Sequence, residues 1–313
     1  MQFLNRLLSH PSQIFQQPST TTTSPPQPKL TSHLLASMQE EYKAATQSPF
    51  LLAAAEGRLS KDVLGKWLAG ERLYFHSYIR AAGKLLATLD LPPLSQVGLG
   101  VEEMAEMRLV DWVIENLARI RGAEKMLVDV AGRYGIEVVD ERGEVGVGPV
   151  DPPEAEGVAG KTEGRKVMVE LMDCEEETEA EVSATTTSHT TTLPTVLTWL
   201  EAAVMFWGTE RCYLDAWSWA KAHQPVRENS DEEGDDDASD DADGGALRRE
   251  FIPSWSSDEF REFVARLEGI IDGAVDREVE KGGAKVREQM LRRLEGKWRS
   301  LVVAGAGFWP VVE

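Results

Sequence analysis

Residues 64–78 read Leu-Gly-Lys-Trp-Leu-Ala-Gly-Glu-Arg-Leu-Tyr-Phe-His-Ser-Tyr, and this stretch decides the fold. Apolar side chains return every three or four residues from Leu64 to Leu85, which predicts an amphipathic helix. Glu71 falls on the same apolar stripe, and Tyr74 follows it by about one turn. A carboxylate on a buried face needs a hydrogen-bond partner, a proton or a cavity. We therefore expect Glu71 to serve a polar site inside a helical protein.

The pattern of one acid on an apolar stripe recurs in three later stretches with helical spacing. They are Glu124 within residues 94–134, Glu210 within residues 194–222 and Glu295 within residues 276–303. Shorter helices are expected over residues 30–45 and 259–275, and Ser60 is placed to cap the helix that carries Glu71. No segment shows convincing strand periodicity, so the predicted class is all-α.

The net charge of −20 is concentrated in two stretches. Residues 137–181 hold 15 acidic and 4 basic side chains, and residues 227–250 hold 11 acidic and 3 basic. The rest of the chain is therefore close to neutral. This balance argues against nucleic-acid binding, because nucleic-acid phosphates would be repelled.

Composition predicts one helical domain over residues 30–313 with two acidic, disordered insertions at about 137–192 and 225–249. Residues 1–29 contain a Thr/Pro-rich segment and are expected to be a disordered tail. A mitochondrial presequence over residues 1–15 is an alternative to this interpretation.

Cysteine and hydropathy patterns bear on the compartment. The chain has two cysteines, Cys174 and Cys212, and no spacing typical of a disulfide framework or a Cys-based metal site. Its longest apolar run, near Leu301–Val312, is too short to cross a bilayer. We expect a cytoplasmic protein without a membrane partner, cofactor or metal.

Four acids on four helices admit three interpretations. A carboxylate-bridged metal pair would need Glu-x-x-His repeats, which are absent. The acids could each pair with arginines at helix interfaces. They could also line one pocket with aromatic side chains, where carboxylates accept hydrogen bonds from a nitrogen-rich ring and a buried acid exchanges a proton. We predict the pocket.

Several segments together resemble the TenA/thiaminase II and PQQC-like proteins, which share the heme-oxygenase-like helical fold. The segments follow in order over about residues 30–135 and 193–303. They are Phe50-Leu51, Gly57-Arg58-Leu59-Ser60, residues 67–74, residues 124–135, Leu193-Pro194-Thr195, residues 255–260 and residues 294–298. The resemblance implies a heme-oxygenase-like bundle of helices.

The resemblance also implies a function. Members of that family bind an aminopyrimidine and hydrolyse thiamin or its breakdown products. This chain has Trp207-Gly208-Thr209-Glu210 where one class of the family carries Pro-Cys, and Cys212 would point elsewhere. It is therefore similar to the Cys-lacking E-type branch, which acts on amino- and formylamino-pyrimidines.

Roles for single residues follow from the resemblance and from the acid-and-aromatic pattern. The expected catalytic residues are Glu295 and Glu210. The expected substrate-binding residues are Glu71, Tyr74, Tyr78, Glu124, Trp199 and Tyr213.

The leading hypothesis is therefore an E-type hydrolase that salvages aminopyrimidines. The alternative is a non-catalytic protein of the same fold that binds a small heteroaromatic ligand. A quinone-cofactor synthase like PQQC is a third hypothesis, less favoured because such chemistry needs more histidines. Homo-oligomers are common in this fold, so we expect one here.

Overall fold

The computed structural model describes residues 28–91, 104–138, 194–225 and 237–312. Every regular element in these residues is helical, as the sequence predicts. The elements are α1 (Leu30–Ala36), α2 (Gln39–Thr46), α3 (Pro49–Ala55), α4 (Lys61–Ala87), α5 (Ala105–Tyr134), α7 (Pro194–Ala222), the 3₁₀ turn η4 (Asp237–Asp240), the π turn η5 (Leu247–Phe251), α8 (Ile252–Trp255) and α9 (Asp258–Ala306).

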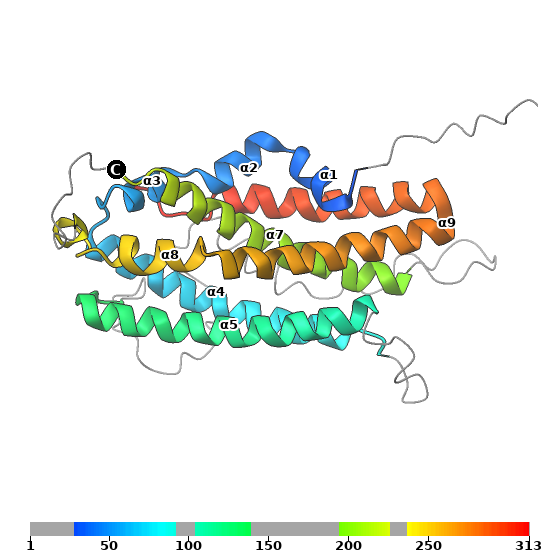
Figure 1. The fold of residues 1–313 in the computed structure, drawn as a ribbon, viewed down its shortest axis with the longest axis horizontal. Coiled ribbons are helices and arrows are strands. Elements are labelled where there is room, and N and C mark those ends of the chain that lie inside the picture. The colour runs from blue at the N-terminus through cyan, green and yellow to red at the C-terminus, as the bar shows by residue number, and fades with distance from the viewer. Residues whose placement is uncertain (1–27, 92–103, 139–193, 226–236, 313) are drawn as a thin grey trace, which may run out of the picture.

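The long helices α4, α5, α7 and α9 run side by side along the long axis of the molecule (Figure 1). Helix α9 turns back on itself, so that its first and second halves count as two rods of the bundle (Figure 1). The short helices α1 and α2 lie against α9, and α3 packs against α7. The tertiary contacts of α7 are mainly with α9, which makes α7 a central helix of the bundle.

Helix ends follow local signals in the sequence. The Ser60 hydroxyl accepts a hydrogen bond from the backbone N–H of Val63, which confirms the predicted cap of α4. Ser257 caps α9 in the same way, so this helix begins at Asp258, one residue before the predicted start at Glu259. Gly135 ends α5 with a φ of 62°, a left-handed conformation that glycine adopts without a Cβ clash.

Two helix breaks differ from the prediction. The predicted helix over residues 30–45 is split into α1 and α2 at Met38, whose φ is 53°. The break in the C-terminal helices lies at Gly283, with a φ of 68°, and not near Asp276. Glycine reaches this conformation at little cost, so the chain reverses there and folds the second half of α9 onto the first.

Residues 237–249 were expected to belong to a disordered insertion, but they form η4 and the start of η5. The buried carboxylate of Asp243 accepts hydrogen bonds from the backbone N–H groups of Gly245 and Leu247. Asp241 forms an ion pair with Arg248. The carboxylates of Asp241 and Asp243 therefore stabilise the local fold of residues 237–249 through these hydrogen bonds and this ion pair. The predicted tail and the predicted insertion at about 137–192 lie almost wholly outside the described residues.

The core is rich in large aromatic side chains, and Gly208 allows α7 to approach α9 closely. A Cβ on Gly208 would lie 2.9 Å from Cδ1 of Leu301 and 3.1 Å from Cζ3 of Trp298. The indole of Trp298 in turn packs against that of Trp207, with centroids 5.4 Å apart. This contact fixes the position of α7 against the second half of α9.

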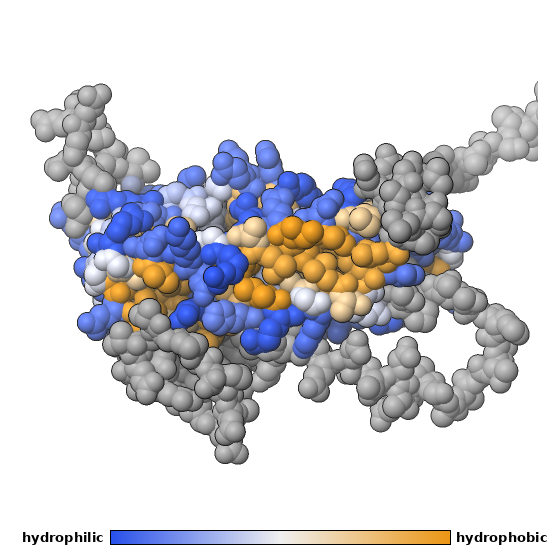
Figure 2. Space-filling view, turned by 90° about the horizontal axis from the view of Figure 1, so that it is seen from below, coloured by the Kyte–Doolittle hydropathy of each residue, from blue (hydrophilic) through white to orange (hydrophobic). Residues whose placement is uncertain are grey.

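The face that Figure 2 shows carries an apolar patch between hydrophilic areas. Exposed large apolar side chains of the described residues include Ile114 and Val128 of α5. A broad apolar surface is typical of protein–protein contact, but the predicted homo-oligomer stays a prediction. Among the described residues, no helix is both long enough and apolar enough to span a membrane.

Candidate functional site

A cavity of about 220 Å³ lies between α4, α5, α7, α8 and the start of α9. Its volume equals that of about seven liquid water molecules, which is room for one six-membered ring with small substituents. The side chains that form the wall include Tyr74, Tyr78, Asn116, Arg119, Thr209, Glu210, Tyr213, Trp255 and Phe260. The wall is therefore largely aromatic, with a few polar groups among the rings.

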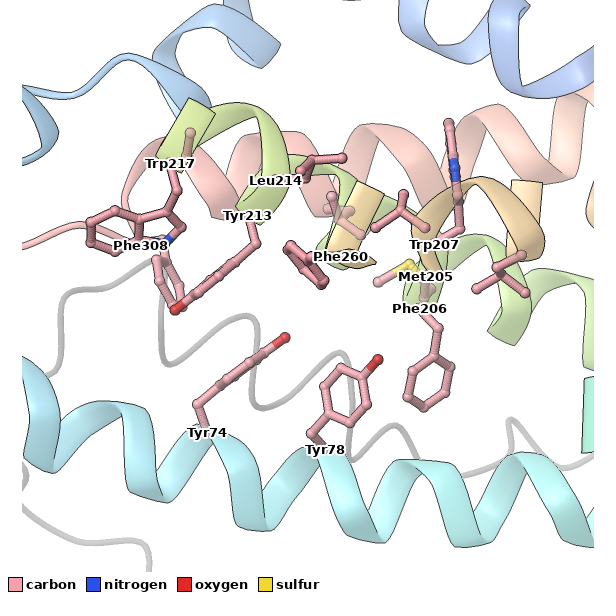
Figure 3. Close-up of a cluster of buried hydrophobic side chains, with 14 of the residues drawn as sticks. Tyr74, Tyr78, Met205, Phe206, Trp207, Tyr213, Leu214, Trp217, Phe260 and Phe308 are labelled. Carbon is pink, nitrogen blue, oxygen red and sulfur yellow. The ribbon is translucent and has the colours of Figure 1, made fainter. Parts of the chain in front are cut away.

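Tyr74 and Tyr213 face each other from α4 and α7 (Figure 3). Their ring planes are within 5° of parallel, and the ring centroids are 6.5 Å apart. The Tyr74 hydroxyl is buried with the Thr209 side chain as a polar neighbour, but no described residue completes a hydrogen bond to it. A buried hydroxyl without a partner costs about 1–3 kcal/mol, so a ligand that bonds to it gains that energy.

Glu210 is the acid that lies in the cavity wall. Its carboxylate accepts a hydrogen bond from the Tyr78 hydroxyl, and Asn116 Nδ2 donates to the same hydroxyl at 2.6 Å. Burial raises the pKa of Glu210 to about 7, although Tyr78, Arg119 and Asn116 all favour the ionised form. Glu210 can therefore hold or release a proton near neutral pH.

Glu71 lies directly behind this cavity wall and is fully buried. Its Oε2 accepts a hydrogen bond from the Tyr213 hydroxyl. Glu71 thus orients one of the two parallel rings. The structure brings together five predicted site residues: Glu71, Tyr74, Tyr78, Glu210 and Tyr213.

Glu124 is not in the cavity wall, because it is bound into a network of basic side chains. Its carboxylate is hydrogen-bonded to Arg72 Nε at 3.3 Å and His76 Nε2 at 3.1 Å, and it pairs with Arg121. Burial opposes ionisation, but the bonds from His76 and Arg72 and the charge of Arg121 outweigh it and lower the pKa of Glu124. The predicted substrate contact is replaced by an ion-pair network between α4 and α5.

Glu295 does not meet the other acids. Glu295 directly follows the fully buried Leu294, so its side chain lies about 100° around the helix from that of Leu294. The Glu295 carboxylate pairs with His33 Nε2 at 2.6 Å. The part of α9 that approaches Tyr74 and Tyr213 begins at Leu301, six residues or about 9 Å further along. The expectation that four acids share one cavity is therefore wrong.

Trp199 is buried but lies ten residues before Thr209, or about 15 Å along α7 from the cavity. This distance along α7 is too great for Trp199 to contact a ligand between Tyr74 and Tyr213. The predicted substrate contact of Trp199 is therefore wrong.

Sequence reasoning missed Asn116 and Arg119 as members of the site, and it did not predict a contact for Thr209. Asn116 follows Leu109, Trp112 and Val113 on the apolar stripe of α5. A buried amide on that stripe is the same signal that identified the glutamates. Arg119 gives no such signal, since arginines are ordinary on exposed helix faces.

Cys212 does not line this cavity but a smaller one of about 20 Å³, which shares Tyr74, Thr209 and Tyr213 with it. Burial raises the pKa of the Cys212 thiol. In the described part of the chain, no three His, Cys, Asp or Glu side chains are grouped to hold a metal ion.

Comparison with solved structures identifies the fold. A TenA homologue from Pyrococcus furiosus superposes with a TM-score of 0.53 and 19% identity, over 90% of this chain and 98% of its own. A TenA family transcription regulator from Silicibacter sp. TM1040 superposes with a TM-score of 0.52 and 11% identity, over 90% of this chain and 95% of its own. The fold is that of the TenA homologues. At these identities, the TenA likeness establishes architecture alone.

Sequence comparison is less informative. No model of a known protein family matches the chain. A curated protein from Fusarium pseudograminearum, described as a probable transcription factor, is 24% identical over 275 residues. That match covers 82% of this chain and 47% of the relative, so the chain spans about half of the relative's length.

Proposed function

We propose that this chain is a TenA-like hydrolase of the E type, which binds a small aminopyrimidine and cleaves a C–N bond on its substituent. The observation that supports this most is Glu210, a buried acid in an aromatic cavity with a pKa of about 7. A general acid works best when its pKa is close to the working pH. The fold of the TenA homologues is consistent with the proposal.

The pyrimidine ring is proposed to enter between Tyr74 and Tyr213. Two stacked contacts at the optimal carbon separation need about 7 Å between the outer rings. The centroids are 6.5 Å apart, and the spacing between the two ring planes cannot exceed this distance, so the rings must move apart by at least about 0.5 Å to admit a planar ring. The unpartnered Tyr74 hydroxyl is then available to a ring nitrogen or an amino group.

Glu210 would act twice in the reaction. In its protonated form it donates the proton to the departing amine as the C–N bond breaks. The resulting carboxylate takes a proton from the water that attacks the carbon, which restores the acid. An aminomethyl-pyrimidine and water thus give a hydroxymethyl-pyrimidine and ammonia. Glu210 would thus act both as the acid and as the base of the reaction. Glu295, the other predicted catalytic residue, is paired with His33 outside the cavity.

The test is release of ammonia from 4-amino-5-(aminomethyl)pyrimidine by the purified chain. Glu210→Gln should lower kcat at least about 100-fold, because loss of a general acid typically costs that much. Glu295→Gln is the matched control and should leave kcat within a few-fold. Absence of turnover by the wild-type chain, or full turnover by Glu210→Gln, would refute the hydrolase.

A binding protein without catalysis is the second candidate. The observation that favours it is that the described part of α9 brings no second acid to the cavity. A thermal-shift titration separates the two functions. Stabilisation by the pyrimidine without ammonia release supports binding alone.

Two of the similar proteins are described as a transcription factor or regulator. The net charge of −20 opposes contact with nucleic-acid phosphates. We therefore do not extend that description to this chain.

A further inference from the structure

Arg119 is the basic side chain in the wall of the cavity, and aromatic rings hold it in place. Its Cζ lies 4.8 Å from the ring centroid of Phe263 and 5.5 Å from that of Phe260. Both rings belong to the first half of α9, whereas Arg119 comes from α5. A guanidinium over two ring faces is oriented by cation–π attraction, so its donors keep a fixed direction.

Arg119 has no hydrogen bond and no ion pair with any described residue. The neighbouring arginines differ from it, because Arg72 and Arg121 both bind Glu124. Glu210 influences Arg119 only through space, and its carboxylate is hydrogen-bonded to Tyr78. The cavity wall thus contains a positioned cation that forms no hydrogen bond or ion pair with a described carboxylate, although the Glu210 carboxyl interacts with it electrostatically.

The rest of the wall favours a planar ligand, as argued from the parallel rings of Tyr74 and Tyr213. Arg119 lines the same cavity of about 220 Å³, which is small enough that a single ring and its substituent would fill it. A ligand held by the tyrosines would therefore share this cavity with the Arg119 side chain. Arginine forms paired, charge-assisted hydrogen bonds to carboxylate and phosphate oxygens.

We propose that the ligand of this cavity is an acidic heteroaromatic compound, with its ring between Tyr74 and Tyr213 and a carboxylate or phosphate substituent on Arg119. This inference rests on the proposed function, and it extends the ligands of the cavity from neutral aminopyrimidines to aminopyrimidines with an acidic substituent.

The experiment compares three probes by isothermal titration calorimetry on the full chain. They are 4-aminopyrimidine-5-carboxylate, the 5-carboxamide of the same size without charge, and the 5-methyl phosphate ester. The wild-type chain should bind the carboxylate or the phosphate roughly 10- to 100-fold more tightly than the carboxamide, the range for a hydrogen-bonded charge. The anion whose affinity exceeds that of the carboxamide by the larger factor identifies which acidic group the subsite fits.

Arg119→Met keeps the aliphatic stem against the rings and should bring the affinity ratio of acid to amide close to one. Arg121→Met removes the same charge two residues away and should keep the ratio. Arg119→Lys retains a charge without the planar fork and should give an intermediate ratio if Arg119→Met does not fold.

The outcomes are distinct. Equal wild-type affinity for acid and amide, or a preference that survives Arg119→Met, overturns the anion subsite and leaves the pyrimidine cavity intact. Failure of all three probes to bind overturns the proposed function as well as this inference.

Discussion

Replacing Glu210 by Gln should change how the stability of the protein depends on pH. Glu210 has a folded-state pKa of about 7, against an ordinary pKa of 4.5 for a glutamate in the unfolded chain. The folded state therefore holds this proton more tightly, and wild-type stability falls as pH rises from about 4.5 to 7. Glutamine stays neutral over this pH range, so the Glu210→Gln variant does not lose this stability as the pH rises.

The magnitude follows from the two pKa values. A difference of about 2.5 pKa units corresponds to roughly 3 kcal/mol once both states are ionised. Between pH 5 and pH 8, the stability of Glu210→Gln relative to wild type should rise by about 2.5 kcal/mol. Because the other ionisable groups are common to both proteins, their contributions cancel in the comparison.

The assay is urea denaturation of both proteins at pH 5 and pH 8, followed by circular dichroism. Thr209→Val is the control, since Thr209 lines the same cavity but does not titrate. The free energy of unfolding of Thr209→Val should differ from that of wild type by the same amount at both pH values. If the difference in free energy of unfolding between Glu210→Gln and wild type is the same at pH 5 and pH 8, or if wild type becomes relatively more stable at pH 8, Glu210 is not a buried acid that holds its proton.

Further measurements test neighbouring parts of the structure. Turnover by the wild-type chain should fall above pH 7 as Glu210 ionises, and Tyr78→Phe should move that fall to higher pH in a pH–rate profile, because the carboxylate loses a donor. Gly208→Ala should cost about 1–3 kcal/mol in urea melts, since the added Cβ meets α9 at 2.9 Å; unchanged stability would contradict that packing. Glu124→Gln should cost about 2 kcal/mol at pH 7. The cost should decrease as the pH falls below 4.5, because the pKa of Glu124 is lower in the folded state and its contribution to stability is lost in acid; a cost at pH 3 equal to that at pH 7 would argue against the ion-pair network.

The sequence by itself determined the helical class, because apolar spacing and capping residues act over a few residues. Ser60 caps the start of α4 as predicted, and α5 ends at Tyr134, where the predicted helical stretch ends. Glu71 and Glu210 were correctly expected to be buried. A polar residue on an apolar stripe is a local signal, and it needs no knowledge of the partner helix.

Only the tertiary structure decided which of these side chains meet. Glu295 carries the same local pattern as Glu210, yet the position and rotation of α9 turn it toward His33. Glu124 meets three basic groups, two of them from α4, while Arg119 lies in the cavity wall and forms no ion pair with a described acid. Such outcomes depend on the register between helices far apart in the chain. Packing contacts such as that of Gly208 with α9 set that register, and helical periodicity does not encode it.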